Sequence, residues 1–335
     1  MSIDIVILGT EKGSKVVPLA EIAQKFGKAE DVKSLERCGT TNLYRFAEGE
    51  SLESKATEIV RGFLDIPEIQ IKPSGLSPPE QNISGIFSSV ACTTSDYQMP
   101  GLARSVGHNL GLSGIPMINL SMGCAGGMHA LQMAYNQLVV DSVNGKRANY
   151  VVIAGDHTSR VLDKEAWDTA GIFSDGVAAA LVSNYVPGPF SIKKIGSTNL
   201  EGDIHSMRID SKEKIFRMDG GKVFDFATKK VFPAALGLLG LEKLPENVYF
   251  IPHQASGAIL DGMRRRHKIP TEQFYSDGIK REGNIPAASV YFGLLDAENK
   301  ELFGYKDVIL CGFGAELAVS AVYLKNNLNG GSENE

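Results

Sequence analysis

Apolar residues recur along the chain with two different spacings, and these predict an alternation of strands and helices. Continuous apolar runs bounded by glycine or polar residues predict strands at residues 3–9, 86–92 and 150–155. Apolar positions three and four residues apart predict helices at residues 19–26, 52–64 and 100–110. Alternation of this kind is typical of a parallel α/β sheet.

The most informative junction of strand and helix lies at residues 116–132, where an apolar run stops at a glycine-flanked turn and a helix-forming stretch begins behind Cys124. A thiol at a helix N-terminus lies near unpaired backbone N–H groups and the positive end of the helix dipole, which favour the thiolate. We therefore expect Cys124 to attack carbonyl groups near neutral pH. The alternative is a buried structural cysteine, the commonest fate of a free thiol.

Two later junctions carry polar side chains at comparable places. His253 ends the apolar run of the segment IPHQAS, and Asn284 follows glycine in the segment GNIPAASV. Taken singly, each has an ordinary explanation, as a hydrogen-bonded structural histidine or an asparagine that favours a turn. The segment NVYFIPHQASGAILDGM also echoes the strand, turn and helix around Cys124, which suggests a duplicated half.

Composition narrows the class of protein. The 335 residues, with 43% hydrophobic content and 36 glycines, suffice for one large or two fused α/β cores. A formal net charge of -5 argues against a broad nucleic-acid-binding surface. Four cysteines show neither a CxxC pair nor metal-ligand spacing, and no signal peptide or long apolar span opens the chain. These features predict a protein of a reducing cytoplasm, with no membrane segment.

In their order and context, Cys124, His253 and Asn284 resemble the catalytic residues of the ketoacyl synthase III family of condensing enzymes. The likeness extends over most of the chain, through ERCGT, TTSDYQMP, FSDGVAAA and the terminal CGFGAELAVSA. It implies a thiolase-like fold in which two similar halves, residues 1–165 with the nucleophile and residues 166–335 with the histidine and asparagine, stack as α-β-α-β-α layers. The resemblance also implies a homodimer.

The same resemblance implies a reaction. Cys124 would take an acyl group from acyl-CoA or an acyl carrier protein, with the backbone N–H groups of Cys124 and Gly314 forming an oxyanion hole. His253 and Asn284 would then donate hydrogen bonds to a malonyl thioester as carbon dioxide leaves, and the enolate would attack the acyl-cysteine. CoA or phosphopantetheine thioesters serve as substrates, acyl carrier protein is the partner, and neither a metal nor a redox cofactor is needed.

Two other functions stay open at this point. A pure acyltransferase would transfer the acyl group without releasing carbon dioxide, and an inactive partner subunit would only shape the site of another synthase. Asn284 favours formation of a carbon–carbon bond, because simple acyl transfer does not need a second donor for an enolate. The sequence does not distinguish fatty-acid initiation from specialised polyketide-type biosynthesis.

Two departures from the family pattern concern the acyl pocket. The terminal loop reads GFGAE where relatives commonly carry a run of glycines, so Glu316 is unusual there. It either contacts a polar substrate or is a salt-bridged or solvent-facing carboxylate. Met99 replaces the phenylalanine that often precedes proline at the pocket wall contributed by the partner subunit. Its flexible side chain could admit a longer or bulkier acyl chain.

The remaining expectations concern the carrier and the donor. A basic stretch follows the HQAS segment and either binds an acidic carrier protein or forms a solvated face: Arg264, Arg265, Arg266 and Lys268. Lys33 and Trp167 fall where relatives hold adenine between an aromatic and a cationic side chain, so we expect the two partners to be exchanged here, with Arg37 of the ERCGT motif nearby. Otherwise Trp167 packs a surface loop and the donor arrives on a carrier protein.

Overall fold

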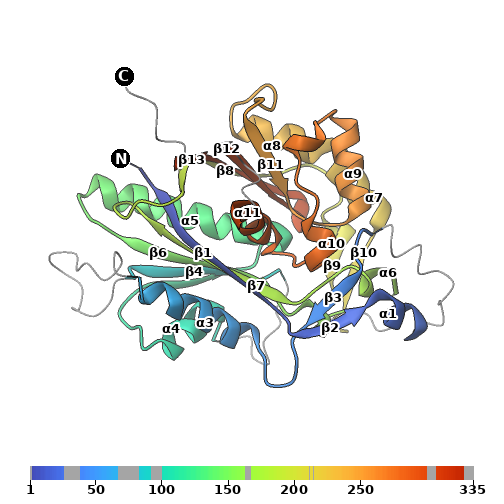
Figure 1. Cartoon of the computed structure of the whole chain (residues 1–335), viewed down its shortest axis with the longest axis horizontal. Coiled ribbons are helices and arrows are strands. Elements are labelled where there is room, and N and C mark those ends of the chain that lie inside the picture. Colours follow the sequence, from blue (N-terminus) through green and yellow to red (C-terminus); the bar gives the residue numbers. More distant parts are fainter. Residues whose placement is uncertain are drawn as a thin grey trace.

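The computed structural model describes residues 2–25, 38–66, 83–91, 100–162, 167–210, 212–213, 215–299 and 307–327. Within these ranges a nine-stranded sheet runs in the order β11-β12-β13-β8-β1-β7-β6-β4-β5 (Figure 1). Its strands are β1 (Asp4–Lys12), β4 (Gly85–Ser89), β5 (Met117–Leu120), β6 (Asn149–Asp156), β7 (Gly176–Ser183), β8 (Phe190–Asn199), β11 (Val248–Pro252), β12 (Asp307–Phe313) and β13 (Ala318–Asn326). Two short ribbons lie beside it, β2 (Lys15–Pro18) with β3 (Asn42–Arg45) and β9 (Met207–Ile209) with β10 (Phe216–Met218).

The sheet consists of two halves that meet at β1 and β8. These two strands pair through Asp4 with Ser191 and Ile5 with Phe190. Strand β4 is parallel to β5 and β6, and β11 is parallel to β12, whereas the other pairs are antiparallel. The alternation of strands and helices predicted a parallel sheet. That prediction is wrong, because the sheet contains both parallel and antiparallel pairs. Because β7 pairs with β1 and β6, the strand order divides after Ser183 and not at residue 165 as predicted.

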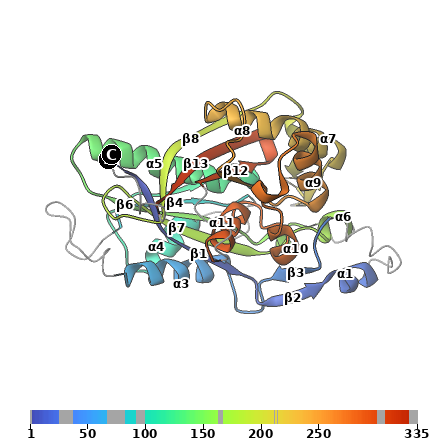
Figure 2. The ribbon, with the colours of Figure 1, turned by 45° about the horizontal axis from the view of Figure 1, so that its top comes forward.

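Helices separate and cover the two halves of the sheet. Helices α3 (Leu52–Leu64) and α4 (Leu102–Asn109) pack on the outer face of one half, and α7 (Gly220–Phe226), α8 (Phe232–Leu238) and α9 (Gly257–Arg266) on that of the other. Helices α5 (Gly126–Val143) and α11 (Ser289–Asn299) lie between them (Figures 1 and 2). This order of layers confirms the predicted thiolase-like α-β-α-β-α fold.

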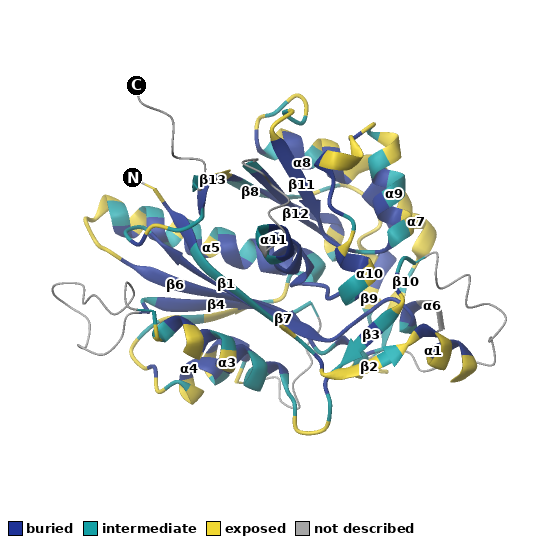
Figure 3. Cartoon of the chain, viewed as in Figure 1, coloured by how far each residue is buried: buried dark blue, intermediate teal, exposed yellow. Residues whose placement is uncertain are grey.

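The local sequence explains why the outer and inner helices differ. Helix α3 begins at a capping box, in which the Ser51 and Ser54 side chains bond each other's backbone N–H, and it buries one face. It has the bounds that its apolar spacing predicts. Helices α5 and α11 contact sheet on both sides, so strands and central helices form the continuous buried region of Figure 3. The Tyr291 hydroxyl donates to the Gly127 carbonyl at 2.8 Å and joins these two helices.

Three short helices complete the described structure: α1 (Leu19–Lys25), α6 (Trp167–Ala170) and α10 (Gly278–Glu282). Among the described helices, none combines the length and the apolar character that crossing a bilayer requires.

Candidate active site

The thiol of Cys124 lies where β5 ends and α5 begins. A short 3-10 helix, Gly123–Ala125, joins them, so the helix-forming stretch does start at the cysteine as predicted. Gly123 has a φ of 54°, in the left-handed region that glycine adopts most readily. A Cβ at this position would also lie 2.9 Å from Cβ of Ala315, so the turn brings the cysteine against the loop after β12.

That loop supplies the second backbone donor, but not from the residue we predicted. The Gly314 N–H donates to the Ala318 carbonyl at 3.1 Å, so it is not available to a substrate. The N–H of Ala315, one residue later, faces the sulfur of Cys124 together with the N–H of Cys124 itself. Gly314 contributes space instead, because a Cβ there would lie 2.6 Å from Cβ of Cys124. The structure thus replaces Gly314 by Ala315 as the second donor.

His253 follows the last residue of β11 and is 2% exposed. Its Nδ1 lies 2.6 Å from the Ser289 hydroxyl, which also accepts the Gln254 N–H at 3.1 Å. The Ser289 hydroxyl can donate to Nδ1 while its oxygen accepts the Gln254 N–H, and in this arrangement the proton of the neutral ring is on Nε2. Ser289 therefore prepares His253 to donate a hydrogen bond from Nε2.

Asn284 follows α10 and is fixed by its backbone. Its N–H donates to the Ile172 carbonyl at 2.9 Å, and its own carbonyl accepts the Ser174 N–H at 2.8 Å. The side-chain Nδ2 donates to the Ala255 carbonyl at 3.1 Å, which leaves its second hydrogen for a ligand. Among the described atoms, Oδ1 of Asn284 is buried without a hydrogen-bond partner.

The three predicted residues line one enclosed space. Cys124, His253 and Asn284 surround a cavity of about 50 Å³, together with Gly314. Its other walls are mainly apolar and come from β10, α9 and the segment before β7. A second cavity, of about 330 Å³, also reaches Cys124 and shares the side chains of Phe173, Met207 and Phe216 with the first. The thiol thus stands between a narrow space that holds the two polar groups and a wider one.

Burial dominates the electrostatics of this site. It raises the pKa of the Cys124 thiol to about 12, the Asp156 carboxylate adds to the rise, and the two backbone N–H groups act in the opposite direction. Burial also lowers the pKa of His253 to about 3, so the imidazole is neutral. Burial and the Asp156 carboxylate therefore oppose the helix N-terminus, and the pKa of Cys124 shifts upward from its ordinary value.

The reactivity of Cys124 should consequently rise with pH over a wide range. The thiolate fraction of a group with a pKa of about 12 increases about tenfold per unit between pH 7 and 10. We expect the rate of Cys124 alkylation by iodoacetamide, followed by peptide mass spectrometry, to increase in this way without levelling off. An unperturbed cysteine, with a pKa of about 8.5, levels off above about pH 9. A plateau below pH 8 would show that the helix N-terminus prevails over burial.

The basic cluster, defined as Arg264, Arg265, Arg266 and Lys268, lies at the end of α9 and beyond it. Arg265 pairs with Asp261 at 2.8 Å, and its side chain is 73% exposed. Arg264 approaches the same carboxylate at 3.5 Å and donates to the Thr271 hydroxyl at 3.2 Å. The cluster therefore faces solvent but is partly neutralised.

Four other predicted positions are not tested. Lys33, Arg37 and Met99 lie outside the described residues, as does the side chain of Trp167, although its backbone begins α6. The exchanged adenine clamp and the pocket-wall methionine stay predictions.

Glu316, the unusual residue of the terminal loop, is exposed and lines the second cavity next to Ala315.

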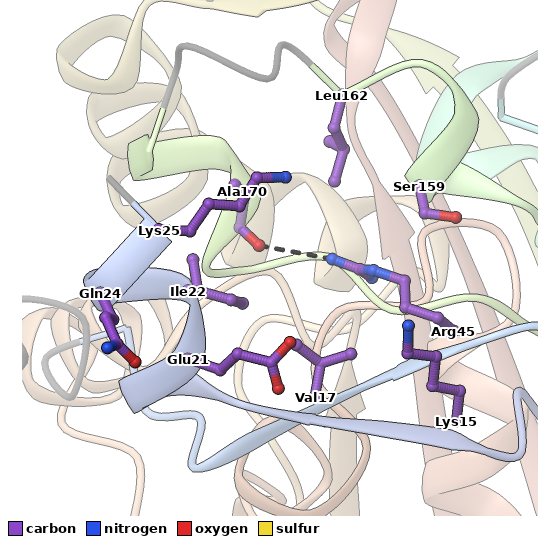
Figure 4. A pocket seen from close by; sticks show the side chains of 10 residues that line it. All are labelled: Lys15, Val17, Glu21, Ile22, Gln24, Lys25, Arg45, Ser159, Leu162 and Ala170. Atoms are coloured by element: carbon purple, nitrogen blue, oxygen red, sulfur yellow. Dashed lines mark hydrogen bonds between the residues drawn. The ribbon is translucent and has the colours of Figure 1, made fainter. Parts of the chain in front are cut away.

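A larger cavity of about 520 Å³ lies elsewhere, between β2, α1, β3 and α6 (Figure 4). Lys15, Lys25 and Arg45 lie around it, and the Arg45 guanidinium donates to the Ala170 carbonyl at 3.4 Å. No residue described as lining it also lines either cavity at Cys124. No cysteine is among the residues described as lining it, so the thiol chemistry belongs at Cys124.

Sequence reasoning missed two groups at the site, Thr158 and Ser289, and in the loop of residues 312–315 it preferred Gly314 to Ala315 as the backbone donor. Ser289 stands five residues after Asn284 at the start of an apolar helix, where a serine is common as a cap, so its contact with His253 had no separate signal. Ala315 was inside the terminal loop, but the choice of donor depends on the turn. Thr158 stands two residues after the end of the buried strand β6, and polar residues near strand ends are the available signal.

Comparisons with known proteins agree with this geometry. The family profile described as 3-oxoacyl-[acyl-carrier-protein (ACP)] synthase III matches residues 118–200, and the profile of its C-terminal part matches residues 244–326. The β-ketoacyl-[acyl-carrier-protein] synthase III of Fusobacterium nucleatum is 31% identical over 252 residues, covering 70% of this chain and 75% of the relative. That of Enterococcus faecalis is 31% identical over 253 residues, covering 71% and 76%.

Solved structures show the same fold. The 3-oxoacyl-(acyl carrier protein) synthase III of Pseudomonas aeruginosa PAO1 superposes with a TM-score of 0.80 at 20% identity, covering 97% of this chain and 98% of the other. The priming β-ketosynthase of the R1128 polyketide pathway gives 0.80 at 22% identity, covering 97% of each chain. Since these relatives are 31% identical to this chain over 70% and 71% of its length, and the three reactive side chains line one cavity, this chain belongs to the β-ketoacyl-[acyl-carrier-protein] synthase III family.

Proposed function

We propose that this protein is a condensing enzyme that transfers an acyl group to Cys124 and joins it to a malonyl thioester with loss of carbon dioxide. The observation that carries the proposal is the single cavity lined by the thiol of Cys124, the imidazole of His253 and the amide of Asn284. The relatives that match are named as synthases of this type. The substrates are thioesters of CoA or of acyl carrier protein, and the protein's own side chains suffice without a cofactor.

In the first half-reaction, the Cys124 sulfur attacks the carbonyl carbon of the acyl thioester. The negative charge on the carbonyl oxygen is held by the N–H groups of Cys124 and Ala315, which already face the sulfur. The bond to the donor's sulfur breaks, a thioester to Cys124 forms, and the proton lost by the thiol leaves on the departing thiol. Because the resting thiol is protonated, the thiol loses its proton only after the substrate has bound.

In the second half-reaction, the malonyl thioester enters the space beside His253 and Asn284. Nε2 of His253 and the free Nδ2 hydrogen of Asn284 donate to its carbonyl oxygen, which becomes the enolate oxygen as carbon dioxide leaves. The enolate carbon attacks the acyl carbon on Cys124, and the released thiolate takes up a proton. A neutral His253 suits this role, because the donor is needed as a hydrogen bond and not as an acid.

The experiment that tests the function is intact-mass profiling with a panel of acyl-CoA and acyl-carrier-protein donors, followed by malonyl carrier protein. We expect a mass increase equal to the acyl group, then its loss together with a ketoacyl product and carbon dioxide. An adduct that is released without carbon dioxide would indicate a pure acyltransferase. No adduct with any donor would contradict the proposal and favour a non-catalytic partner subunit.

We further propose that the basic cluster contributes to docking of the malonyl carrier protein. It lies on the helix whose first turns line the catalytic cavity, and Arg265 is six residues beyond the lining residue Ile259, about 9 Å along the helix axis. An acidic carrier would be attracted to this surface. The Asp261 carboxylate weakens the field of Arg264 and Arg265. Arg266 and Lys268 are exposed and form no ion pair with the residues that the structure describes, so they add to the proposal.

Replacing both Arg265 and Arg266 with glutamate should weaken the use of malonyl carrier protein about tenfold more than the use of malonyl-CoA. Added salt should mimic the effect, since exposed charges are screened. The matched control is the double replacement of Lys193 and Lys194 by glutamate, which makes the same change of charge on the exposed side of β8. Equal losses with both substrates would place docking elsewhere.

We also propose a homodimer formed at the edge of β5. This strand ends the sheet order, and among the described strands none pairs with its outer edge. Ile118 on the strand is 37% exposed, and Met133 and Val140 on α5 are 38% and 52% exposed. An exposed apolar edge strand favours association with another strand.

A glutamate at position 118 should therefore convert the dimer into a monomer in sedimentation velocity experiments, because it places a charge in the proposed interface. The control is Val16→Glu on β2, where valine is 50% exposed away from this edge. A wild-type protein that sediments as a monomer, or an Ile118→Glu protein that stays dimeric, would contradict the proposal.

A cytoplasmic location is the last part of the proposal. Cys124 and Cys311 form no disulfide among the described residues, which suits a reducing compartment. The intact-mass experiment also shows whether the acyl donor is a CoA thioester or an acyl carrier protein.

A further inference from the structure

The wider cavity beside Cys124 is not uniformly apolar. Its volume is about 330 Å³, and apolar side chains form much of its wall: Ala91, Phe173, Met207, Ile209, Phe216 and Pro286. Thr158 and Glu316 interrupt this lining, and Arg208 and His205 stand at its exposed side. Because Cys124 belongs to the same wall, this is the space available to the acyl group.

Thr158 presents an unsatisfied polar group to this space. Its residue is 1% exposed, and its Oγ1 has no hydrogen-bond partner anywhere in the described structure. Buried hydroxyls nearly always find a partner, since leaving one unpaired carries a desolvation penalty. A ligand group that fills the cavity and bonds this hydroxyl would remove the penalty. The buried hydroxyl is thus the first observation that points to a polar acyl chain.

Glu316 provides a second, independent observation. Its backbone is left-handed, with a φ of 62°, and Leu317 follows with a φ of 54°. Residues other than glycine adopt this region at a cost and tend to do so at functional sites. Its carbonyl accepts the Asn199 Nδ2 at 3.1 Å, which fixes the turn, while its carboxylate forms no ion pair within the described residues. Glu316 lines the same cavity as Cys124 and Thr158, so it borders the space available to the acyl group.

Resting on the proposed condensing function, we propose that the acyl group taken up by Cys124 carries a hydroxyl, which hydrogen-bonds to Thr158 and Glu316. A hydroxyl can both donate, as the carboxylate requires, and accept, as the hydrogen of Thr158 requires. An ammonium group could only donate, and it would lose its hydration against the apolar wall. The reaction leaves the hydroxyl unchanged: the donor thioester breaks, the Cys124 thioester forms, and the thiol proton leaves on the released thiol.

The test compares rates of Cys124 acylation, by intact mass, for CoA thioesters of equal chain length that are unsubstituted, carry a hydroxyl at the third or fourth carbon, or carry an amine there. For the wild-type protein we expect a hydroxyacyl donor to react about tenfold faster than the unsubstituted one, the value of one net hydrogen bond to a well-placed group. Thr158→Val, which keeps the shape, should remove most of that preference. Glu316→Ala should reduce it, and Glu316→Gln, which retains an acceptor oxygen, should reduce it less.

The matched control is Thr228→Val. Thr228 is equally buried, but its hydroxyl donates to the Phe224 carbonyl at 2.8 Å and lies outside both cavities, so the preference should not change. Glu316→Gly removes the carboxylate and also relieves the left-handed turn, so it should reduce the preference as much as Glu316→Ala does if the carboxylate carries the effect. Equal rates for hydroxylated and unsubstituted donors, or a preference for the amine, would overturn the inference while the condensing function stands. Absence of an adduct with every donor would instead overturn the function itself.

Discussion

A Cys124→Ala protein will form no acyl adduct with any thioester donor, whereas the wild-type protein will gain the mass of one acyl group. Among the side chains described around the catalytic cavity, Cys124 alone is a thiol, and neither the buried imidazole nor the amide can form the same thioester. The expected effect is complete loss of the covalent intermediate and of condensation. Intact-mass spectrometry after brief incubation with the donor measures it directly.

The control for this experiment is Cys38→Ala, since Cys38 is a second cysteine that is not fully buried. That variant should keep the adduct. A mass increase that persists on the Cys124→Ala protein and disappears on the Cys38→Ala protein would show that the nucleophile has been misassigned. Cys311 is fully buried within the second half, so it does not compete for the donor.

Asn284→Ala should separate the two half-reactions. Acylation of Cys124 uses the backbone N–H groups of Cys124 and Ala315 and should continue, whereas the enolate loses one of its two preorganised donors. Loss of one such donor lowers a rate by about 10² or more. We expect release of carbon dioxide from radiolabelled malonyl carrier protein to fall by that factor, while the acyl adduct still forms at close to the wild-type rate.

Asn284→Asp tests whether shape or hydrogen bonding matters, because the carboxylate has nearly the same outline but no hydrogens to donate. It should behave like the alanine variant in decarboxylation. An equal decline of both half-reactions in either variant, with a lowered melting temperature, would assign Asn284 a structural role. The backbone bonds of Asn284 to Ile172 and Ser174 persist in both variants, so a structural loss would come from the change of the side chain alone.

Much of the fold was predictable because its determinants are local. The helix at residues 52–64 has its apolar spacing and its capping serines within the segment, and it was predicted with the bounds that it has. The strands at residues 86–92 and 150–155 were predicted within a few residues of β4 and β6. The three reactive residues were recognisable because each follows a strand or a glycine turn, and the structure brings them to one cavity.

The electrostatics of the site were not predictable in the same way. The helix N-terminus at Cys124 is visible in the sequence, but segments distant along the chain also act on the thiol. The loop of Gly314 packs against it, and the Asp156 carboxylate raises its pKa by charge repulsion. Burial reverses the sign of the expected pKa shift. The choice between Gly314 and Ala315 likewise depends on a turn in which Glu316 and Leu317 are both left-handed, a conformation that their types do not favour.

The division of the chain also depended on pairing. Strand β7 follows residue 165, so sequence order assigns it to the second half, yet its hydrogen bonds join it to β1 and β6. The spacing of apolar residues shows that a segment forms a buried strand, but it does not show which strands it pairs with. The same apolar run could be buried in either half of the sheet. Only the folded sheet shows that the change between halves comes after Ser183.

The two ends of the sheet order have a consequence for how such an enzyme could arise. Cys124 follows β5, the last strand of that order, and His253 follows β11, the first. If the two halves descend from one ancestral module that was copied and fused, the same structural position has become a nucleophile in one copy and a hydrogen-bond donor in the other. An ancestor with identical modules would have offered two thiols or two imidazoles, never one of each. On that descent, the present reaction requires that the two copies diverged at this position, because it uses one thiol and one imidazole.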